Sequence, residues 1–212
     1  MPLQLPRIYP ITDAAISSLT HTEQVGHLIA GGATLIQLRE KTNSARSFFE
    51  DATSALRLAR TAGATIIIND RVDIALALGA HGVHLGQTDM PVNAARRLLG
   101  AEAIIGYSTH NLDQVREALK LPINYLAFGP IFPTRSKQDA DPVAGLDSLR
   151  AAKALSGDVP LVAIGGINQA NLADVFLAGA DSAAIISEIV STPQNIAENL
   201  RKMLLCADGQ LR

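Results

Sequence analysis

The chain has 212 residues, of which 48% are hydrophobic and 18% charged, and its formal net charge at pH 7 is −2. This length supports one well-formed hydrophobic core, and the weak charge provides no long-range attraction for nucleic acid or an anionic membrane. The only cysteine, Cys206, excludes an intramolecular disulfide, and no apolar stretch resembles a signal peptide or a membrane span. We therefore expect a cytoplasmic protein that binds neither nucleic acid nor membranes.

Eight short apolar runs, rich in β-branched residues, predict strands along the chain. Continuously apolar runs are typical of a parallel sheet that is covered on both faces. The runs span 7–12, 33–38, 65–69, 82–86, 103–108, 124–129, 160–166 and 182–187. Their starts recur about every 25 residues, which suits one strand and one helix per step, and eight such units close a barrel. We therefore predict an α/β protein with a single (β/α)8 TIM barrel domain over residues 1–212.

Apolar residues at helical spacing separate several of these runs. The clearest helix is predicted over 44–62, and Gly63 can end it. Pro91 suits the first turn of a further helix, a short helix is expected near 172–176, and a last one covers roughly 194–205. An open doubly wound sheet is the main alternative fold, but no glycine-rich nucleotide-binding motif follows any of the runs.

Charged and polar residues follow the predicted strands. In a barrel the C-terminal ends of all strands meet at one face, and catalysis takes place there. Residues far apart in the sequence are therefore expected around one pocket. They are Arg39, Lys41, Asn69, Asp70, Asp89, Ser108, Lys137, Gly166 and Ser187.

Asp70 and Asp89 are the candidate metal ligands, because each follows a predicted strand. Mg²⁺ is typically held by one or two carboxylates, with water and substrate phosphate oxygens completing its shell. Asp70 could instead cap the helix that begins near Arg71. For Asp89 this alternative is weaker, because Pro91 at the first helical position makes Met90 the cap.

Gln37, Arg39 and Lys41 alternate along an extended segment, so they point to one side and the two intervening side chains point to the other. Burying such groups at a barrel mouth is costly without a ligand or a partner. The cations suit the oxygens of a diphosphate. An internal salt bridge to Asp70 is the alternative.

The connection over 129–141 is long, since typical connections have about 4–6 residues, and it carries hydroxyl groups and Lys137. Long loops at a catalytic face often act as lids. The alternative is a disordered surface insertion, which the rigid G-P-I-F-P segment at the start of the connection disfavours. Farther along, two glycines at 165–166 follow the seventh run, where backbone N–H groups commonly bind phosphate.

Two of the five histidines lie on or next to predicted strands near the expected pocket. His84 lies within a run and is interpreted as a packed or hydrogen-bonded residue. His110 follows the fifth run, so it could transfer a proton at the pocket mouth. No His-x-x-x-His pattern occurs, so zinc is not expected.

Together, these motifs resemble the thiamine phosphate synthase (thiamine-phosphate pyrophosphorylase) family. The matching stretches span nearly the whole chain in order: YPITD, QLREK, INDRVDIALALGAHGVHLGQTDMP, IIGYSTH, YLAFGPIFPT, AIGGI and AGAD. The resemblance implies a (β/α)8 barrel that couples 4-amino-2-methyl-5-hydroxymethylpyrimidine diphosphate with thiazole phosphate, giving thiamine phosphate and pyrophosphate. The implied mechanism is dissociative: pyrophosphate leaves first, the aminopyrimidine stabilises the methylene cation, and the thiazole nitrogen captures it.

The resemblance also implies roles for particular residues. Asp70 and Asp89 would hold Mg²⁺, and Arg39, Ser108 and Lys137 would act in catalysis. The pyrimidine diphosphate would be bound by Gln37, Leu38, Arg39, Glu40, Lys41, Asn69, Ser108 and Lys137. The thiazole phosphate would be bound by Thr134, Ser136, Gly166, Ile186 and Ser187, and Arg135 is a further expected substrate-binding residue.

The sequence departs from the family pattern at three positions. Ser136 stands where the lid of the family usually has threonine, and Ser182 and Glu188 replace small residues. Glu188 adds a negative charge near the expected phosphate site. Two alternatives stay open: a thiazole tautomerase, in which His110 would shuttle protons without metal, and a non-catalytic protein that binds a phosphate ligand. The partners expected are small molecules, and a homo-oligomer is compatible with the sequence.

Overall fold

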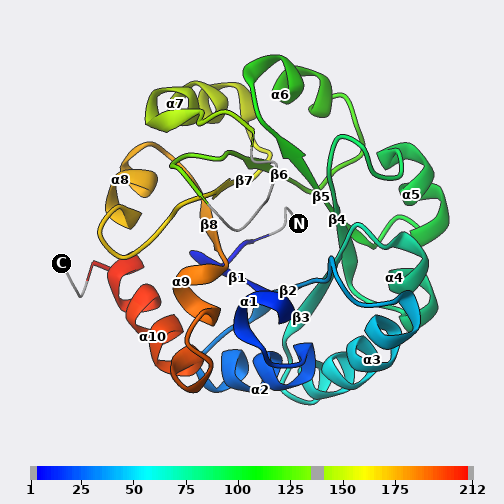
Figure 1. The fold of residues 1–212 in the computed structure, drawn as a ribbon. Coiled ribbons are helices and arrows are strands. Elements are labelled where there is room, and N and C mark those ends of the chain that lie inside the picture. Colours follow the sequence, from blue (N-terminus) through cyan, green and yellow to red (C-terminus); the bar gives the residue numbers. More distant parts are fainter. Residues whose placement is uncertain (1–3, 135–140, 210–212) are drawn as a thin grey trace.

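The computed structural model describes residues 4–134 and 141–209. Its eight strands are all parallel and form a closed barrel in the order of the sequence, surrounded by helices (Figure 1). Pairing of the first strand with the eighth closes the sheet. The strands are β1 (Ile8–Asp13), β2 (Leu35–Arg39), β3 (Thr65–Asn69), β4 (Gly82–Leu85), β5 (Ile104–Thr109), β6 (Tyr125–Phe128), β7 (Leu161–Ile164) and β8 (Ser182–Ile185). The predicted (β/α)8 TIM barrel is confirmed.

Helices follow every strand and form the outer ring of the barrel (Figure 1). They are α1 (Ala14–Ser17), α2 (His21–Ala30), α3 (Ala45–Thr61), α4 (Val72–Leu78), α5 (Val92–Leu99), α6 (Leu112–Ala118), α7 (Gly145–Ser156), α8 (Leu172–Leu177), α9 (Ser187–Val190) and α10 (Ile196–Ala207), with a 3₁₀ turn η1 (Pro193–Asn195). None of the helices in the described ranges is both long and apolar enough to cross a membrane.

The observed boundaries follow from local signals that differ in strength. Ser44 caps α3 by accepting a hydrogen bond from the backbone N–H of Ser47, so this helix lies one residue inside the predicted range at each end. The eighth strand ends two residues earlier than predicted, because the backbone leaves the extended conformation at Ile186. Pro91 itself is the N-cap of α5, so the expectation that Met90 caps this helix is wrong.

Two apolar layers make up the core. The outer layer packs the strands against the helices, and the inner layer fills the barrel with side chains such as Tyr9, Ile67 and Tyr125. Gly106 on β5 is needed for this filling, because a Cβ atom there would lie 2.0 Å from the ring of Tyr125. A large polar aromatic side chain therefore occupies the centre of the barrel, below the ends of the strands.

Ser182 on β8 is fully buried, and its hydroxyl is the one buried side-chain polar atom in the described residues without a hydrogen-bond partner. An unsatisfied buried hydroxyl costs about 1–3 kcal/mol. We expect Ser182→Ala to raise the free energy of unfolding by about 1 kcal/mol in urea denaturation. Ser156→Ala is the control, since the buried Ser156 hydroxyl donates to the Lys153 carbonyl at 3.1 Å and its loss should destabilise. A destabilised Ser182→Ala would contradict the prediction.

Candidate active site

Asp70 occupies the turn between β3 and α4 in an unusual backbone conformation. Its φ of 60° lies in the left-handed region, which residues other than glycine seldom adopt. Its backbone N–H donates to the carbonyl of His84 on β4 at 2.8 Å, which secures this turn to the neighbouring strand. The N-cap of α4 is Arg71, and no side chain caps this helix, so the alternative that Asp70 caps it is wrong. The Asp70 carboxylate is thereby left for other contacts at the strand ends.

Asp89 follows β4, and its carboxylate lies beside that of Asp70. One Asp89 oxygen accepts a hydrogen bond from the backbone N–H of Gly86 at 2.6 Å. Burial raises the pKa of Asp89, and the Asp70 carboxylate raises it further, although the Gly86 N–H acts in the opposite direction. Two adjacent carboxylates at the end of neighbouring strands suit a hard divalent cation such as Mg²⁺.

The carboxylate pair must be completed by other ligands if it is to hold a metal. No set of three or more His, Cys, Asp or Glu side chains within the described ranges could hold a metal ion. Mg²⁺ commonly keeps several waters and binds substrate phosphates in addition to one or two carboxylates. The donor set of Asp70 and Asp89 therefore fits Mg²⁺ bound together with a diphosphate, and their role as metal ligands stays a prediction.

The two cations at the end of β2 and just after it have carboxylate partners at the mouth of the barrel. Lys41 donates to Asp70 at 2.5 Å, so the internal salt bridge considered as an alternative is present, and the Lys41 side chain stays half exposed. Arg39 donates to Asp13 at the end of β1, and both side chains are largely buried. Sequence reasoning missed Asp13, although its position at a strand end resembles that of Asp70. The guanidinium of Arg39 has five N–H groups, so one contact with Asp13 leaves donors for a ligand.

The side chains of Leu38 and Glu40 point away from the barrel interior, as the alternation along this segment predicts. Leu38 is fully buried in the outer layer. Glu40 accepts hydrogen bonds from the backbone N–H groups of Thr42 at 2.7 Å and Asn43 at 2.9 Å, and it lies 3.2 Å from His21. In this arrangement only backbone atoms of Leu38 and Glu40 could contact a ligand in the barrel mouth, and the Glu40 side chain orders the turn after β2.

The Glu40 carboxylate should make stability depend on pH in the acid range. Burial raises its pKa, but the N–H groups of Asn43 and Thr42 outweigh burial and lower it to about 2. Because the pKa is depressed in the folded state, this stabilisation is present above pH of about 4.5 and is lost as the pH falls toward 2. We expect the difference in unfolding free energy between the parent and Glu40→Gln to narrow from pH 6 to pH 3 in urea denaturation. A constant difference across this range would contradict the assignment.

A series of buried polar side chains crosses the interior of the barrel, and we call it the polar path. The amide nitrogen of Gln37 donates to the Tyr9 hydroxyl at 3.1 Å, and the Tyr9 and Tyr125 hydroxyls are 3.1 Å apart. His84 lies between Tyr125 and Ser108. Its Nδ1 is 3.0 Å from the Tyr125 hydroxyl oxygen, and its Nε2 is 2.8 Å from the Ser108 hydroxyl oxygen. The interpretation of His84 as a hydrogen-bonded residue is confirmed.

Burial controls the protonation of the polar path. It raises the pKa of Tyr9 and of Tyr125 well above the usual value for tyrosine, so both phenols keep their protons. It lowers the pKa of His84 to about 4, so the imidazole is neutral at pH 7. The path therefore links two predicted substrate ligands, Gln37 and Ser108, through uncharged groups. Asn69, a further predicted ligand, is 8% exposed and is the last residue of β3, the strand between β2 and β4.

The glycines after β7 bring this strand end close to the segment after β6. Gly166 has a φ of 66°, and a Cβ atom there would lie 2.5 Å from the carbonyl oxygen of Pro133. The Phe132 N–H donates to the Gly165 carbonyl at 3.0 Å. Thr134 follows directly, so the structure brings two of the predicted thiazole phosphate ligands, Thr134 and Gly166, to the same side of the mouth.

The remaining predicted phosphate ligands divide into two groups. Ile186 and Ser187 follow β8, the neighbour of β7, and Ser187 is the first residue of α9. Glu188 is exposed in the first turn of the same helix. The predicted ligands Arg135, Ser136 and Lys137 lie outside the described residues.

His110 joins the end of β5 to both ends of the long connection. Its Nδ1 lies 2.7 Å from the carbonyl oxygen of Gly129, and its Nε2 lies 3.4 Å from the Asp141 carboxylate. A carbonyl oxygen can only accept, so Nδ1 carries a proton. These contacts indicate that His110 anchors the connection, whereas its predicted role in proton transfer stays a prediction.

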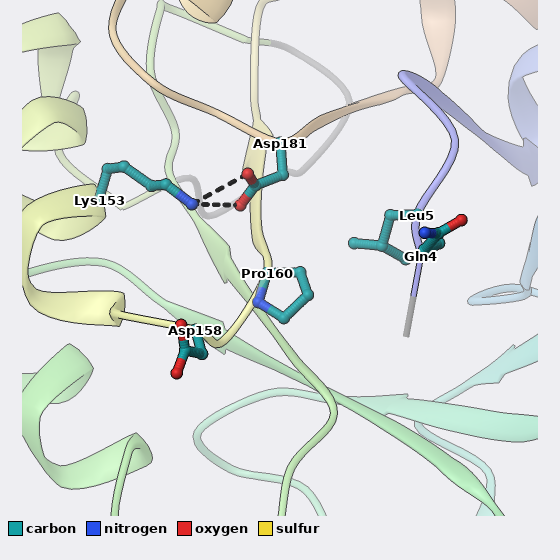
Figure 2. A pocket seen from close by; sticks show the side chains of 6 residues that line it. All are labelled: Gln4, Leu5, Lys153, Asp158, Pro160 and Asp181. Atoms are coloured by element: carbon teal, nitrogen blue, oxygen red, sulfur yellow. Dashed lines mark hydrogen bonds and ion pairs between the residues drawn. The ribbon is translucent and has the colours of Figure 1, made fainter. Parts of the chain in front are cut away.

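A separate hollow of about 310 Å³ lies at the opposite, N-terminal ends of the strands (Figure 2). Its lining consists of Gln4, Leu5, Lys153, Asp158, Pro160 and Asp181. Lys153 donates to both carboxylate oxygens of Asp181 at 2.9 and 2.7 Å, and Asp181 also accepts from the N–H of Leu161. The Lys153 ammonium is thus paired within the protein. The Lys153–Asp181 ion pair therefore holds α7 against the start of β7.

Comparisons with known proteins agree on one family. The family profile described as "Thiamine monophosphate synthase" matches residues 8–189. A thiamine-phosphate synthase from Chloroflexus aurantiacus is 49% identical over 87% of this chain and 85% of its own length, and one from Koribacter versatilis is 44% identical over 95% and 97%. The solved thiamine phosphate pyrophosphorylase from Pyrococcus furiosus is 35% identical, with a TM-score of 0.86 and 97% of each chain covered. This chain therefore belongs to the thiamine monophosphate synthase family.

Proposed function

We infer that this chain is a thiamine-phosphate synthase, a transferase that couples the hydroxymethylpyrimidine diphosphate with thiazole phosphate and releases pyrophosphate. Relatives that are 44–49% identical over most of their length carry this name. The observation that carries the inference is the meeting of two carboxylates, Asp70 and Asp89, with Lys41 at the mouth of the barrel. A tautomerase or a simple binding protein has no need for that set.

We propose that the mouth residues bind the diphosphate and stabilise its departure. Mg²⁺ held by Asp70 and Asp89 would supply positive charge to the leaving pyrophosphate. Lys41, which donates to Asp70, would exchange this contact for one with the diphosphate. Arg39, oriented by Asp13, would donate from its remaining N–H groups. Preorganised cations of this kind favour a dissociative step because negative charge grows on the leaving group.

The thiazole phosphate would bind on the other side of the mouth. Backbone N–H groups near Gly166, Ile186 and Ser187 lie where phosphates commonly bind in barrels of this type, after the seventh and eighth strands. Thr134, in the connection after β6, would contribute its hydroxyl. This placement would hold the thiazole facing the carbon from which pyrophosphate departs, so capture of the cation needs no large movement.

An assay of pyrophosphate release tests the proposed function. Purified protein is incubated with both substrates, with Mg²⁺ or with excess chelator, and pyrophosphate and thiamine phosphate are quantified. We expect both products in equal amounts and only in the presence of Mg²⁺. Thiazole isomerisation without pyrophosphate release would support the tautomerase alternative, and ligand binding without turnover would support the non-catalytic one.

His110→Ala separates the synthase from the tautomerase within the same assay. Because the contacts of His110 are with Gly129 and Asp141, its loss should loosen the connection without removing a group that the coupling requires. We expect His110→Ala to retain coupling activity within roughly tenfold of the parent, a change equivalent to about 1.4 kcal/mol. Loss of all chemistry in this variant, with Asp89→Ala unaffected, would favour the tautomerase.

We further propose a cytoplasmic location with small molecules as partners. The single cysteine, Cys206, suits a reducing compartment and supports this proposal. A homo-oligomer is compatible with it.

A further inference from the structure

We propose that the polar path fixes one direction of hydrogen bonding across the barrel, so that Ser108 presents its hydroxyl proton to an acceptor atom of the pyrimidine diphosphate. Tyr9, Tyr125 and His84 are then positioning residues, which act on the ligand through Ser108. The identity of the ligand rests on the proposed function, whereas the direction of the path rests on contacts within the protein.

The direction follows first from Gln37. Its amide nitrogen, which can only donate, faces the Tyr9 hydroxyl at 3.1 Å. The Tyr9 oxygen therefore accepts this bond. Its single proton is available for the Tyr125 hydroxyl, 3.1 Å away. Tyr125 in turn accepts from Tyr9 and has one proton left to give.

The second half of the path transfers this direction to Ser108. The remaining neighbour of the Tyr125 hydroxyl in the path is Nδ1 of His84, at 3.0 Å, so Nδ1 accepts the Tyr125 proton. A neutral imidazole whose Nδ1 accepts carries its own proton on Nε2. That proton is donated to the Ser108 oxygen at 2.8 Å. Because this oxygen accepts from His84, the hydroxyl proton of Ser108 points elsewhere, and Ser108 is only half-buried near the end of β5.

Burial makes a mixed arrangement unfavourable. Tyr125 is fully buried, and Tyr9 and His84 are 1% and 6% exposed, so water does not replace a missing bond. If one member reversed alone, two donors or two acceptors would face each other in a medium of low polarity. A partial reversal would leave one buried phenol proton without an acceptor, so only complete reversal also pairs every proton in the path. It would need the carbonyl oxygen of Gln37 to face Tyr9, and it would make Ser108 donate to His84.

The two complete arrangements differ in an observable property of His84. In the proposed direction the proton of the imidazole is on Nε2, and in the reverse direction it is on Nδ1. Long-range ¹H–¹⁵N NMR of histidine-labelled protein distinguishes these tautomers, with His84→Gln used to assign the signal. We expect the Nε2–H form at pH 7.5 without substrates. An Nδ1–H form would overturn the proposal, and this result does not depend on whether the protein is a synthase.

Tyr125→Phe tests whether the path acts on the ligand. This change removes the donor to His84 Nδ1 and keeps the ring that fills the barrel, so the tautomer should no longer be fixed. We expect kcat/KM for the pyrimidine diphosphate to fall roughly 5- to 10-fold, the effect of about one hydrogen bond, while KM for thiazole phosphate stays unchanged. Equal effects on both substrates, or none on either, would overturn the positioning role.

Thr109→Val is the matched control. The Thr109 hydroxyl is also fully buried on β5, but it donates to the Ala127 carbonyl at 2.9 Å and lies outside the path. Its loss should lower the melting temperature while the His84 tautomer and both KM values stay as in the parent. A kinetic change in Thr109→Val equal to that in Tyr125→Phe would assign the effect to general destabilisation and overturn the proposal.

Discussion

Replacing Asp89 with asparagine is expected to lower the rate of pyrophosphate release roughly 10²–10³-fold, the cost that removal of one preorganised electrostatic group often has. Asparagine keeps the size of the side chain and an oxygen that can accept from the Gly86 N–H, which Asp89 contacts at 2.6 Å. The fold should therefore be unchanged in a thermal melt. The lost charge removes one of two proposed ligands for Mg²⁺, so the Mg²⁺ concentration for half-maximal rate should rise.

Asp70→Asn should behave in the same way, and Asp73→Asn is the matched control for both. Asp73 is exposed on α4, three residues after Asp70, and forms an ion pair with Arg71. Its loss removes the same charge from the same part of the surface without touching the mouth. We expect parent-like rates and a parent-like Mg²⁺ titration. If Asp70→Asn and Asp89→Asn also had full rates and unchanged titrations, the metal assignment would be wrong.

Lys137→Ala is expected to lower the coupling rate by roughly 10²–10³-fold, because the proposed cation at the leaving diphosphate is lost. The position lies outside the described residues, so the prediction rests on the sequence alone. The melting temperature should change little, since the proposed role of this lysine is in binding the ligand. Rates over a range of each substrate, with a thermal melt of the same preparation, check this result.

Lys120→Ala provides the control for Lys137→Ala. Lys120 is exposed after α6 and pairs with Glu117, so its replacement removes a positive charge far from the predicted ligands. Arg39 is a poorer test of the diphosphate site, because its removal leaves the buried carboxylate of Asp13 without its cation and should destabilise the fold. A Lys137→Ala variant with the parent rate would refute a role in diphosphate binding.

The order of the strands, and with it the end of the barrel at which the candidate site residues gather, was accessible from the sequence. Strands in a parallel barrel are buried on both faces, so they appear in the sequence as uninterrupted apolar runs. The spacing of these runs indicates the number of strand–helix units. The alternation of side chains correctly separated Gln37, which lies in the barrel, from Leu38, which lies in the outer layer. Such patterns depend only on the local backbone conformation, so they do not change with the packing of the rest of the chain.

The partners of the polar and charged groups were decided only by the tertiary structure. Tyr9 and Tyr125 are 116 residues apart and meet because the barrel closes around them, with Gly106 leaving the space that Tyr125 needs. Arg39 pairs with Asp13 because β1 and β2 align these two residues in register. A hydrophobic pattern specifies which face of a strand is buried. Which polar groups then meet depends on strand register and barrel closure, and these are properties of the assembled sheet.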